Sequence, residues 1–225
     1  VVARRIADSL TPGWMQIGAV WLPLPHLVSS LPVQWDGFYR TGAFGVALSV
    51  VCFAATIYLL TRMLAGLTHS PLGALAGALT FGLNPNVLYL QSTPMTEPLL
   101  MALTALATWL GIEAFRTGDA RGIRRAGLAL AAAAMTRYEA WPFAAALLLL
   151  GLLSALRQGR PLRESIVLAC RLAAYPAAAV LAFAVLSRAT VGAWFVQSGF
   201  FIAENPDLHR PLRALLSVWW GAHEL

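Results

Sequence analysis

Charged side chains are scarce in this chain. Only 12% of its residues are Asp, Glu, Lys or Arg, whereas a soluble domain has about 25%. Hydrophobic residues make up 59%, and the mean hydropathy is +0.68. Several apolar runs approach the roughly 20 residues that cross a bilayer, and the alternation of a membrane β-barrel is absent. The composition excludes an ordinary soluble domain and predicts an all-α polytopic membrane protein.

Lysine is missing altogether, so arginine supplies the whole basic charge and a formal net charge of +6. The arginines cluster in short segments between apolar runs, which is the pattern of loops on the cytoplasmic side of a membrane. No basic stripe with interleaved aromatic residues occurs, and no nucleic-acid motif is present. The partners predicted from this pattern are therefore membrane lipids and no nucleic acid.

Cysteine is nearly absent. Cys52 and Cys170 both lie inside apolar runs, where we expect buried small side chains rather than a disulfide or a metal site. The motifs HExxH, GxSxG and CxxC and the phosphate-binding P-loop are absent too. A divalent metal cofactor is possible, but no residue pattern requires one. The start at VVARRIADS, without Met or a signal peptide, suggests a fragment of a longer protein.

Six membrane spans are predicted. Four are apolar runs, the second interrupted near Asn84, and they cover residues 41–60, 71–90, 99–115 and 166–187. The other two lie within residues 126–156, which as one helix would be about 46 Å long and exceed a hydrocarbon core of about 30 Å. The TRYEAWP stretch interrupts that run. A reversal at 136–142 puts both flanking arginine clusters on the same side, as the charge rule favours.

The resulting topology divides a single transmembrane domain, 1–225, into three parts: a first external loop with interfacial helices at 1–40, spans at 41–187, and an external loop with the start of the next segment at 188–225. Trp-rich and Pro-rich residues 1–36 predict a short helix near 2–9, a turn at 11–13 and an interfacial helix broken by WLPLPH. Arg62, 116–125 and 157–163 are expected on the cytoplasmic side. Residues 84–98 and 137–142 are expected outside, with most of the carboxylates.

The polar stretch NPNVLYLQSTPMTEPL, residues 84–99, separates two apolar runs and contains Glu97. An unpaired acid at the edge of a membrane segment is costly, which favours a catalytic or metal-binding carboxylate in an external cavity. The alternative is an acid in the first turn of a helix, where it meets exposed N–H groups and the favourable helix dipole.

Arg137, Tyr138 and Glu139 form the second candidate. An arginine at the membrane edge can hold a phosphate through two parallel hydrogen bonds. The alternative is an intramembrane ion pair, or anchoring of Tyr138 at the interface. Three weaker candidates are His26, as a metal ligand or proton carrier, Asp8, which equally suits a turn, and Gln91, which could bind a sugar hydroxyl.

Three segments together resemble a family. The stretches ARRIADSLTPGWMQIGAVWLPLPH, NPNVLYLQSTPMTEPL and TRYEAW, in this order between apolar spans, are similar to bacterial membrane glycosyltransferases of the GT-C superfamily. These enzymes are relatives of the protein O-mannosyltransferases and of the transferases that add aminoarabinose to lipid A. The resemblance covers most of the chain, and each segment alone is weak.

The resemblance implies a multi-pass enzyme of the bacterial inner membrane with its site on the periplasmic or extracellular side. It would move a sugar from a polyprenyl-phosphate donor to a hydroxyl of a protein, lipid or glycan acceptor. Glu97 matches the family's second catalytic acid, Asp8 is a substitute for the first, and Arg137 suits the lipid phosphate. The alternatives are a transporter or flippase of lipid-linked sugars, built on broken helices, and a non-catalytic scaffold.

Overall fold

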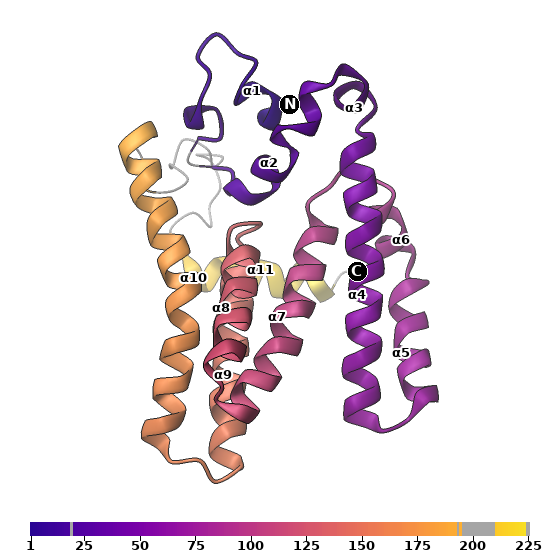
Figure 1. Cartoon of the computed structure of the whole chain (residues 1–225), viewed down its shortest axis with the longest axis vertical. Helices are drawn as coiled ribbons and strands as arrows, with labels where there is room; N and C mark the ends of the chain where they lie inside the picture. The colour runs from indigo at the N-terminus through magenta and orange to yellow at the C-terminus, as the bar shows by residue number, and fades with distance from the viewer. Residues whose placement is uncertain (19, 193, 195–209, 224–225) are drawn as a thin grey trace.

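The computed structural model describes residues 1–18, 20–192, 194 and 210–223, and all regular structure in that part of the chain is helical (Figure 1). The segment before α4 forms short elements, which are α1 (Val2–Arg5), α2 (Pro23–Ser30), α3 (Asp36–Thr41) and two 3₁₀ turns at Trp14–Gln16 and Pro32–Gln34. The helices of the bundle follow as α4 (Ala43–Thr68), α5 (Pro71–Gly82), the short α6 (Pro85–Gln91), α7 (Glu97–Thr117), α8 (Ala120–Ala134), α9 (Ala140–Arg157) and α10 (Leu162–Val191). After the undescribed stretch comes α11 (Pro211–His223).

Within the described residues, four helices are long and apolar enough to cross a membrane: α4, α7, α9 and α10. The chain is therefore a multi-pass membrane protein by its helices, but the six predicted spans are not confirmed. The 71–90 run is divided because Asn84 caps a new helix, accepting hydrogen bonds from the N–H groups of Asn86 and Val87 at 2.9 and 3.4 Å. Pro85 at the first helical position suits that start. The α8 helix has only 15 residues.

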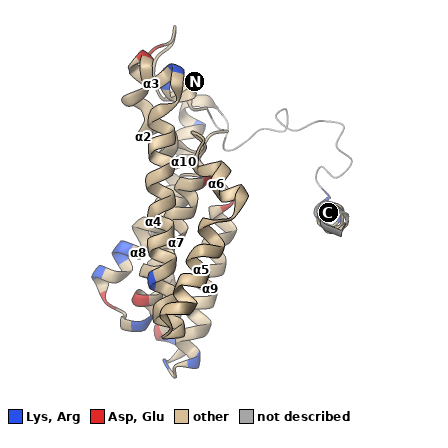
Figure 2. Cartoon of the chain, turned by 90° about the vertical axis from the view of Figure 1, so that its right-hand side faces the viewer, with Lys and Arg blue, Asp and Glu red and all other residues tan. Residues whose placement is uncertain are grey.

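The predicted reversal at 136–142 is confirmed. The α8 helix ends at Ala134 and α9 begins at Ala140, so the two helices form a hairpin rather than one long rod. Both flanking arginine clusters consequently lie at one end of the bundle, which Figure 2 shows as the blue segments at its lower end. We call this the arginine end, formed by the loops at 118–119 and 158–161 and the helix ends beside them. The opposite end, where α4, α7 and α9 begin, is called the site end.

Small residues hold α7, α8, α9 and α10 together. The buried core of this four-helix unit is largely alanine, including Ala107, Ala114 and Ala126, with Leu130 and Leu172 filling the remaining space. Small side chains let helices approach closely, so their backbones gain van der Waals contact. In a bilayer this contact drives helix association, because the hydrophobic effect does not distinguish lipid from another helix. Two glycines make room for aromatic rings in this core. The Tyr175 ring lies directly over Gly127 and the Phe115 ring over Gly151, where a Cβ atom would collide with the ring.

Three local expectations need correction. The WLPLPH stretch does not break a helix: Pro23 begins α2, because a proline at the first helical position loses no hydrogen bond. The helix expected near 2–9 is shorter, ending at Arg5. Cys52 is buried as expected, but Cys170 is exposed, because it faces away from the helices that pack on α10.

The loop that leads into α7 is fixed against α4. The Ser49 hydroxyl donates to the carbonyl of Thr93 at 2.8 Å, and Ser49 itself is buried. At Gly45 the backbone of α4 comes so close to the loop that an added Cβ would lie 2.6 Å from the Cβ of Pro94. This contact sets the position from which residues 96 and 97 enter the site end.

The close approach at Gly45 predicts that a Gly→Ala substitution there affects stability differently from the same substitution at Gly66. Gly45→Ala is expected to destabilise the protein by about 1–3 kcal/mol through overpacking against Pro94. Gly66→Ala, in the same helix with open space around it, is expected to be neutral or to stabilise by about 0.5–1 kcal/mol, because alanine favours helix. Thermal unfolding in detergent measures both. Equal melting temperatures for the two variants would contradict the packing argument.

Candidate functional site

Three segments that are far apart in the sequence meet at the site end. Arg137, in the α8–α9 turn, donates from Nη1 to Oε1 of Glu97 at the start of α7, at 2.8 Å. The Tyr138 hydroxyl donates to the carbonyl of Val20 at 3.0 Å. The N–H of Leu24 donates to the carbonyl of Met135 at 3.0 Å. The expected convergence of the 1–40, 84–98 and 137–142 segments is therefore present.

The guanidinium group of Arg137 is the centre of this arrangement. Its Nη1 donates to Glu97 and, at 3.1 Å, to the hydroxyl of Thr96. Its Nη2 donates to Oε1 of Glu139 at 2.6 Å, and its Nε points at the same carboxylate. One cation thus joins two carboxylates, and the local charge of the three groups is −1. The Arg137 side chain is 30% exposed.

Glu97 is the first residue of α7, but its carboxylate accepts a hydrogen bond from Arg137 and none from the helix backbone. Of the alternative interpretation of Glu97 as a first-turn acid, only one part therefore applies: its carboxylate lies near the positive end of the helix dipole. Oε1 accepts from Arg137, whereas Oε2 is buried without a hydrogen-bond partner in the described part of the chain. A buried carboxylate oxygen with an unused acceptor site has unfulfilled hydrogen-bonding capacity.

The two residues after Arg137 have different environments. The hydrogen bonds from Arg137 lower the pKa of the Glu139 carboxyl below its usual 4.5, and the same contacts raise the pKa of Arg137. Partial burial raises the pKa of the Tyr138 phenol. The Tyr138 ring lies edge-on to Trp141, whose indole N–H donates to the carbonyl of Ala134 at 3.0 Å. These contacts hold the α8–α9 turn in one conformation.

A cavity of about 440 Å³ opens beside Arg137. One wall comes from the segment before α2 and from α2 itself, and the other from the two turns that carry Thr96 and Tyr138. Most of the lining surface is apolar, from residues that include Trp21, Leu22 and Pro25. The polar groups in the lining include His26, Thr136, Arg137 and Glu139. Glu97 stands behind Arg137 rather than in the lining. Such a mostly apolar cavity with convergent polar groups is the usual form of a small-molecule site.

His26 is brought to this cavity, as its candidate role required. Its ring lies edge-on to Trp21 with the ring centres 6.0 Å apart. Burial lowers the pKa of its imidazole below 6.5. His26 is therefore neutral near pH 7, which suits a proton acceptor or a hydrogen-bond partner better than a fixed cation.

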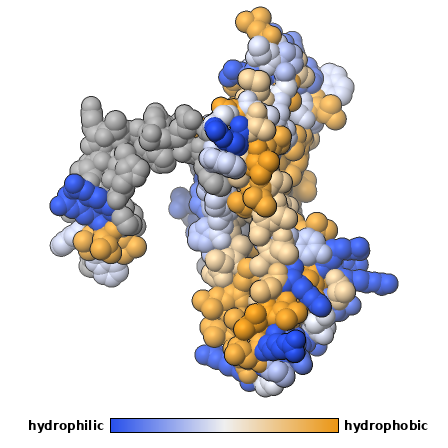
Figure 3. Space-filling model, turned by 90° about the vertical axis from the view of Figure 1, so that its left-hand side faces the viewer, coloured by the Kyte–Doolittle hydropathy of each residue, from blue (hydrophilic) through white to orange (hydrophobic). Residues whose placement is uncertain are grey.

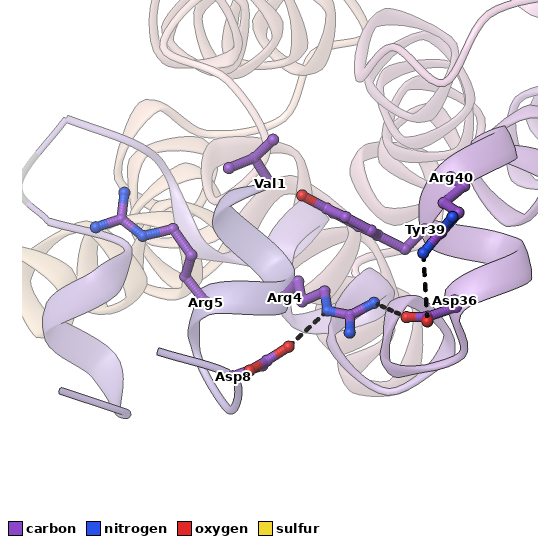
Figure 4. Close-up of a pocket in the computed structure, with 7 residues that line it drawn as sticks. All are labelled: Val1, Arg4, Arg5, Asp8, Asp36, Tyr39 and Arg40. Atoms are coloured by element: carbon purple, nitrogen blue, oxygen red, sulfur yellow. Dashed lines mark hydrogen bonds and ion pairs between the residues drawn. The ribbon is translucent and has the colours of Figure 1, made fainter. Parts of the chain in front are cut away.

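Asp8 is placed elsewhere. It lines a second cavity of about 340 Å³, shown in Figure 4, together with Arg4, Arg5, Asp36 and Tyr39. There Arg4 donates to Asp8 at 2.8 Å and to Asp36 at 2.6 Å, and its guanidinium lies over the Tyr39 ring. Asp8 and Glu97 therefore do not share a cavity. The pKa of Asp36 is lowered by the bond from Arg4.

Gln91 is half-buried at the end of α6 and does not line the cavity beside Arg137. The sequence reasoning missed Thr96 as a partner of Arg137, and Trp21 and Thr136 as lining residues. Thr96 had a signal, since it directly precedes Glu97. Trp21 and Thr136 had none, because only the packing of α2 on the α8–α9 turn brings them together. No group of three His, Cys, Asp or Glu side chains that could hold a metal ion is found within the described ranges.

Comparison of the chain with protein-family models, curated proteins and solved structures gives no match. The family resemblance therefore depends on the three sequence segments alone, and the site has to be interpreted from its own geometry.

The environment of His26 predicts its titration. Because burial lowers its pKa in the folded protein, the midpoint of the His26 imidazole is expected below 6.5, and protonation at lower pH is expected to destabilise the fold. NMR of the ¹³C-labelled histidine rings in detergent measures the midpoint, and the signal missing from His26→Gln assigns it. A midpoint at or above 6.5 would show that the ring is solvated or paired with an acid.

Proposed function

We propose that the protein is a membrane glycosyltransferase that moves a sugar from a polyprenyl-phosphate donor to an acceptor hydroxyl. The observation that supports this most is the Arg137 centre: a fixed guanidinium and two carboxylates beside a mostly apolar cavity, at one end of a bundle of membrane helices. The chemistry needs a cation for the phosphate, a carboxylate for the hydroxyl proton, and exclusion of water.

The donor phosphate would bind where Glu139 now meets Arg137. The Glu139 side chain is 60% exposed, and its carboxylate accepts bonds from both Nε and Nη2 of the guanidinium. A phosphate presents the same two-oxygen geometry to this edge of an arginine. The other edge stays bound to Glu97 and Thr96, so Arg137 would keep its orientation when Glu139 is displaced.

Glu97 would act as the base once an acceptor hydroxyl reaches Oε2, which is buried beside the cavity, behind Arg137. In the transfer step the acceptor oxygen attacks the anomeric carbon, its proton passes to Oε2 of Glu97, and the bond from that carbon to the phosphate oxygen breaks. The polyprenyl phosphate leaves with the bonding electron pair and gains one negative charge. Arg137 stabilises that charge, and Oε2 is the carboxylate oxygen that has no partner beforehand.

The mostly apolar lining of the cavity suits a donor whose lipid tail stays in the membrane. The acceptor would be a protein, lipid or glycan, and the site would lie on the periplasmic or extracellular side of a bacterial inner membrane. The arginine end would then be cytoplasmic, as the charge rule predicts.

A transporter or flippase of lipid-linked sugars is the second candidate. One observation favours it: the break between α5 and α6 at Leu83 and Asn84, since transporters bind substrates at interrupted helices. The charged groups, however, gather at the end of the bundle rather than at that break. A site at the membrane edge suits transfer to an acceptor outside the bilayer better than passage through it.

The role of Glu97 is tested by comparing it with a second glutamate of the same helix, α7. Glu97→Gln is expected to lower transfer from radiolabelled polyprenyl-phosphate sugars by about 100- to 10,000-fold, the usual contribution of a general base. Glu113→Gln is the matched control, because Glu113 lies in the same helix at the arginine end and pairs with Arg116. Activity lost in Glu139→Gln but kept in Glu97→Gln would assign the base to Glu139. Equal activity in all three variants would contradict the mechanism.

The role of Arg137 is tested by keeping its charge. Arg137→Lys preserves a cation beside Glu97 but removes the two-bond contact, so kcat/KM for the lipid-linked donor is expected to fall about 10- to 100-fold. Most of the fall should appear as a higher KM for the donor, with the KM for the acceptor unchanged. Arg116→Lys, an exposed arginine at the other end, is the control. An unchanged donor KM would place the phosphate elsewhere.

A further inference from the structure

A third cavity, of about 600 Å³, lies at the arginine end, far from the groups discussed so far. It is formed between the α7–α8 turn and the first turns of α10. Its lining combines three arginines and one acid with apolar side chains: Arg160, Arg163, Arg171, Glu164, Ile123 and Val167.

The helical repeat of α10 puts part of this lining on one face. Arg163, Val167 and Arg171 are each four residues apart, so they share one side of the helix. Arg160 reaches the cavity from the α9–α10 loop, where its Nη2 donates to the carbonyl of Arg116 at 3.4 Å. Arg160 lies close over the α7–α8 turn at Gly118, whose φ of +70° favours glycine.

The positive charge of this cavity is not compensated by the protein. None of its three arginines forms an ion pair within the described part of the chain, although Glu164 lies among the lining residues. The cavity around Arg4 differs, since both of its acids are paired with Arg4. Three guanidinium groups and one carboxylate leave a local charge of +2, which an anionic ligand would neutralise.

The position of the cavity favours a lipid as that ligand. The α10 helix has 30 residues and is about 45 Å long, roughly 15 Å more than a hydrocarbon core. The first nine residues of α10, 162–170, account for about 14 Å of this surplus. Arg163 lies within them, and Arg171 is the next residue of the helix. Figure 3 shows hydrophilic and hydrophobic side chains mixed over the lower end of this face. Basic cavities between membrane helices at this level bind anionic headgroups.

We propose that this cavity binds the phosphate headgroup of an anionic membrane lipid, with Arg163 and Arg171 as its ligands and an acyl chain along Val167. The guanidinium groups would donate hydrogen bonds to the phosphate oxygens. The apolar wall would favour a lipid over a free phosphate ion, because only the lipid has an acyl chain to bury against it. The site is independent of the proposed transfer reaction, because it lies at the opposite end of the bundle.

Native mass spectrometry of the purified full chain tests this site. Phosphatidylglycerol or phosphatidylcholine of matched chain length is titrated into the protein, and retained lipid is counted. Wild type is expected to retain phosphatidylglycerol preferentially, and Arg163→Gln/Arg171→Gln to weaken its binding by about 10- to 30-fold. The control is Arg121→Gln/Arg124→Gln, which removes two exposed arginines from the same end without touching the cavity.

Equal retention of the two lipids by wild type, or equal loss in the two double variants, would overturn the proposal. Displacement of the lipid by millimolar inorganic phosphate would show a site for soluble phosphate instead and would overturn its assignment to a lipid. A salt titration of wild type needs no variant. Binding of phosphatidylglycerol must weaken as NaCl rises, and binding that is insensitive to salt would overturn the ionic contact.

Discussion

The ion pair between Arg137 and Glu97 is the contact on which the site end depends. It joins the start of α7 to the α8–α9 turn across forty residues of sequence, and both side chains are largely withdrawn from solvent, with 30% and 24% exposed. Loss of either partner would leave a poorly solvated charge, which costs more than the pair itself contributes. The pair therefore fixes where the two segments meet, and the cavity beside it follows from that position.

Two other features of the structure make this contact possible. The alanine-rich surfaces of α7 to α10 bring the helices close enough for short turns to meet at the same level. The loop before α7 is fixed on α4 by Ser49 and by the space at Gly45, so Thr96 and Glu97 arrive at a defined place. The polar groups around Arg137 are thus positioned by apolar packing on two sides.

The three cavities differ in how their charges are balanced. Around Arg4, both aspartates of the cavity accept from that one guanidinium, so the acids are already paired. Around Arg137, two carboxylates oppose one cation, and one of them, Glu139, is exposed enough to be replaced by a ligand. Around Arg163, the arginines have no acid paired with them in the described residues. The second cavity thus has an exposed acid that a ligand can replace, and the third has arginines without a paired acid, which is why these two carry binding proposals.

The sequence alone determined the helical class, the reversal at 136–142 and the gathering of three polar segments at one end, because apolar run length and arginine placement are local signals. The six spans that it predicted are not confirmed, and one reason is the cap at Asn84, which divides a run that hydropathy joins. Of the candidate site residues it named, Arg137, Glu139 and His26 line one cavity and Glu97 pairs with Arg137, whereas Asp8 lies in another cavity. Only the tertiary structure decided that Glu97 pairs with Arg137, that Thr96 shares this contact, and that Trp21 lines the cavity. Those contacts depend on the rotation and depth of helices far apart in the chain, which packing sets and no local pattern records.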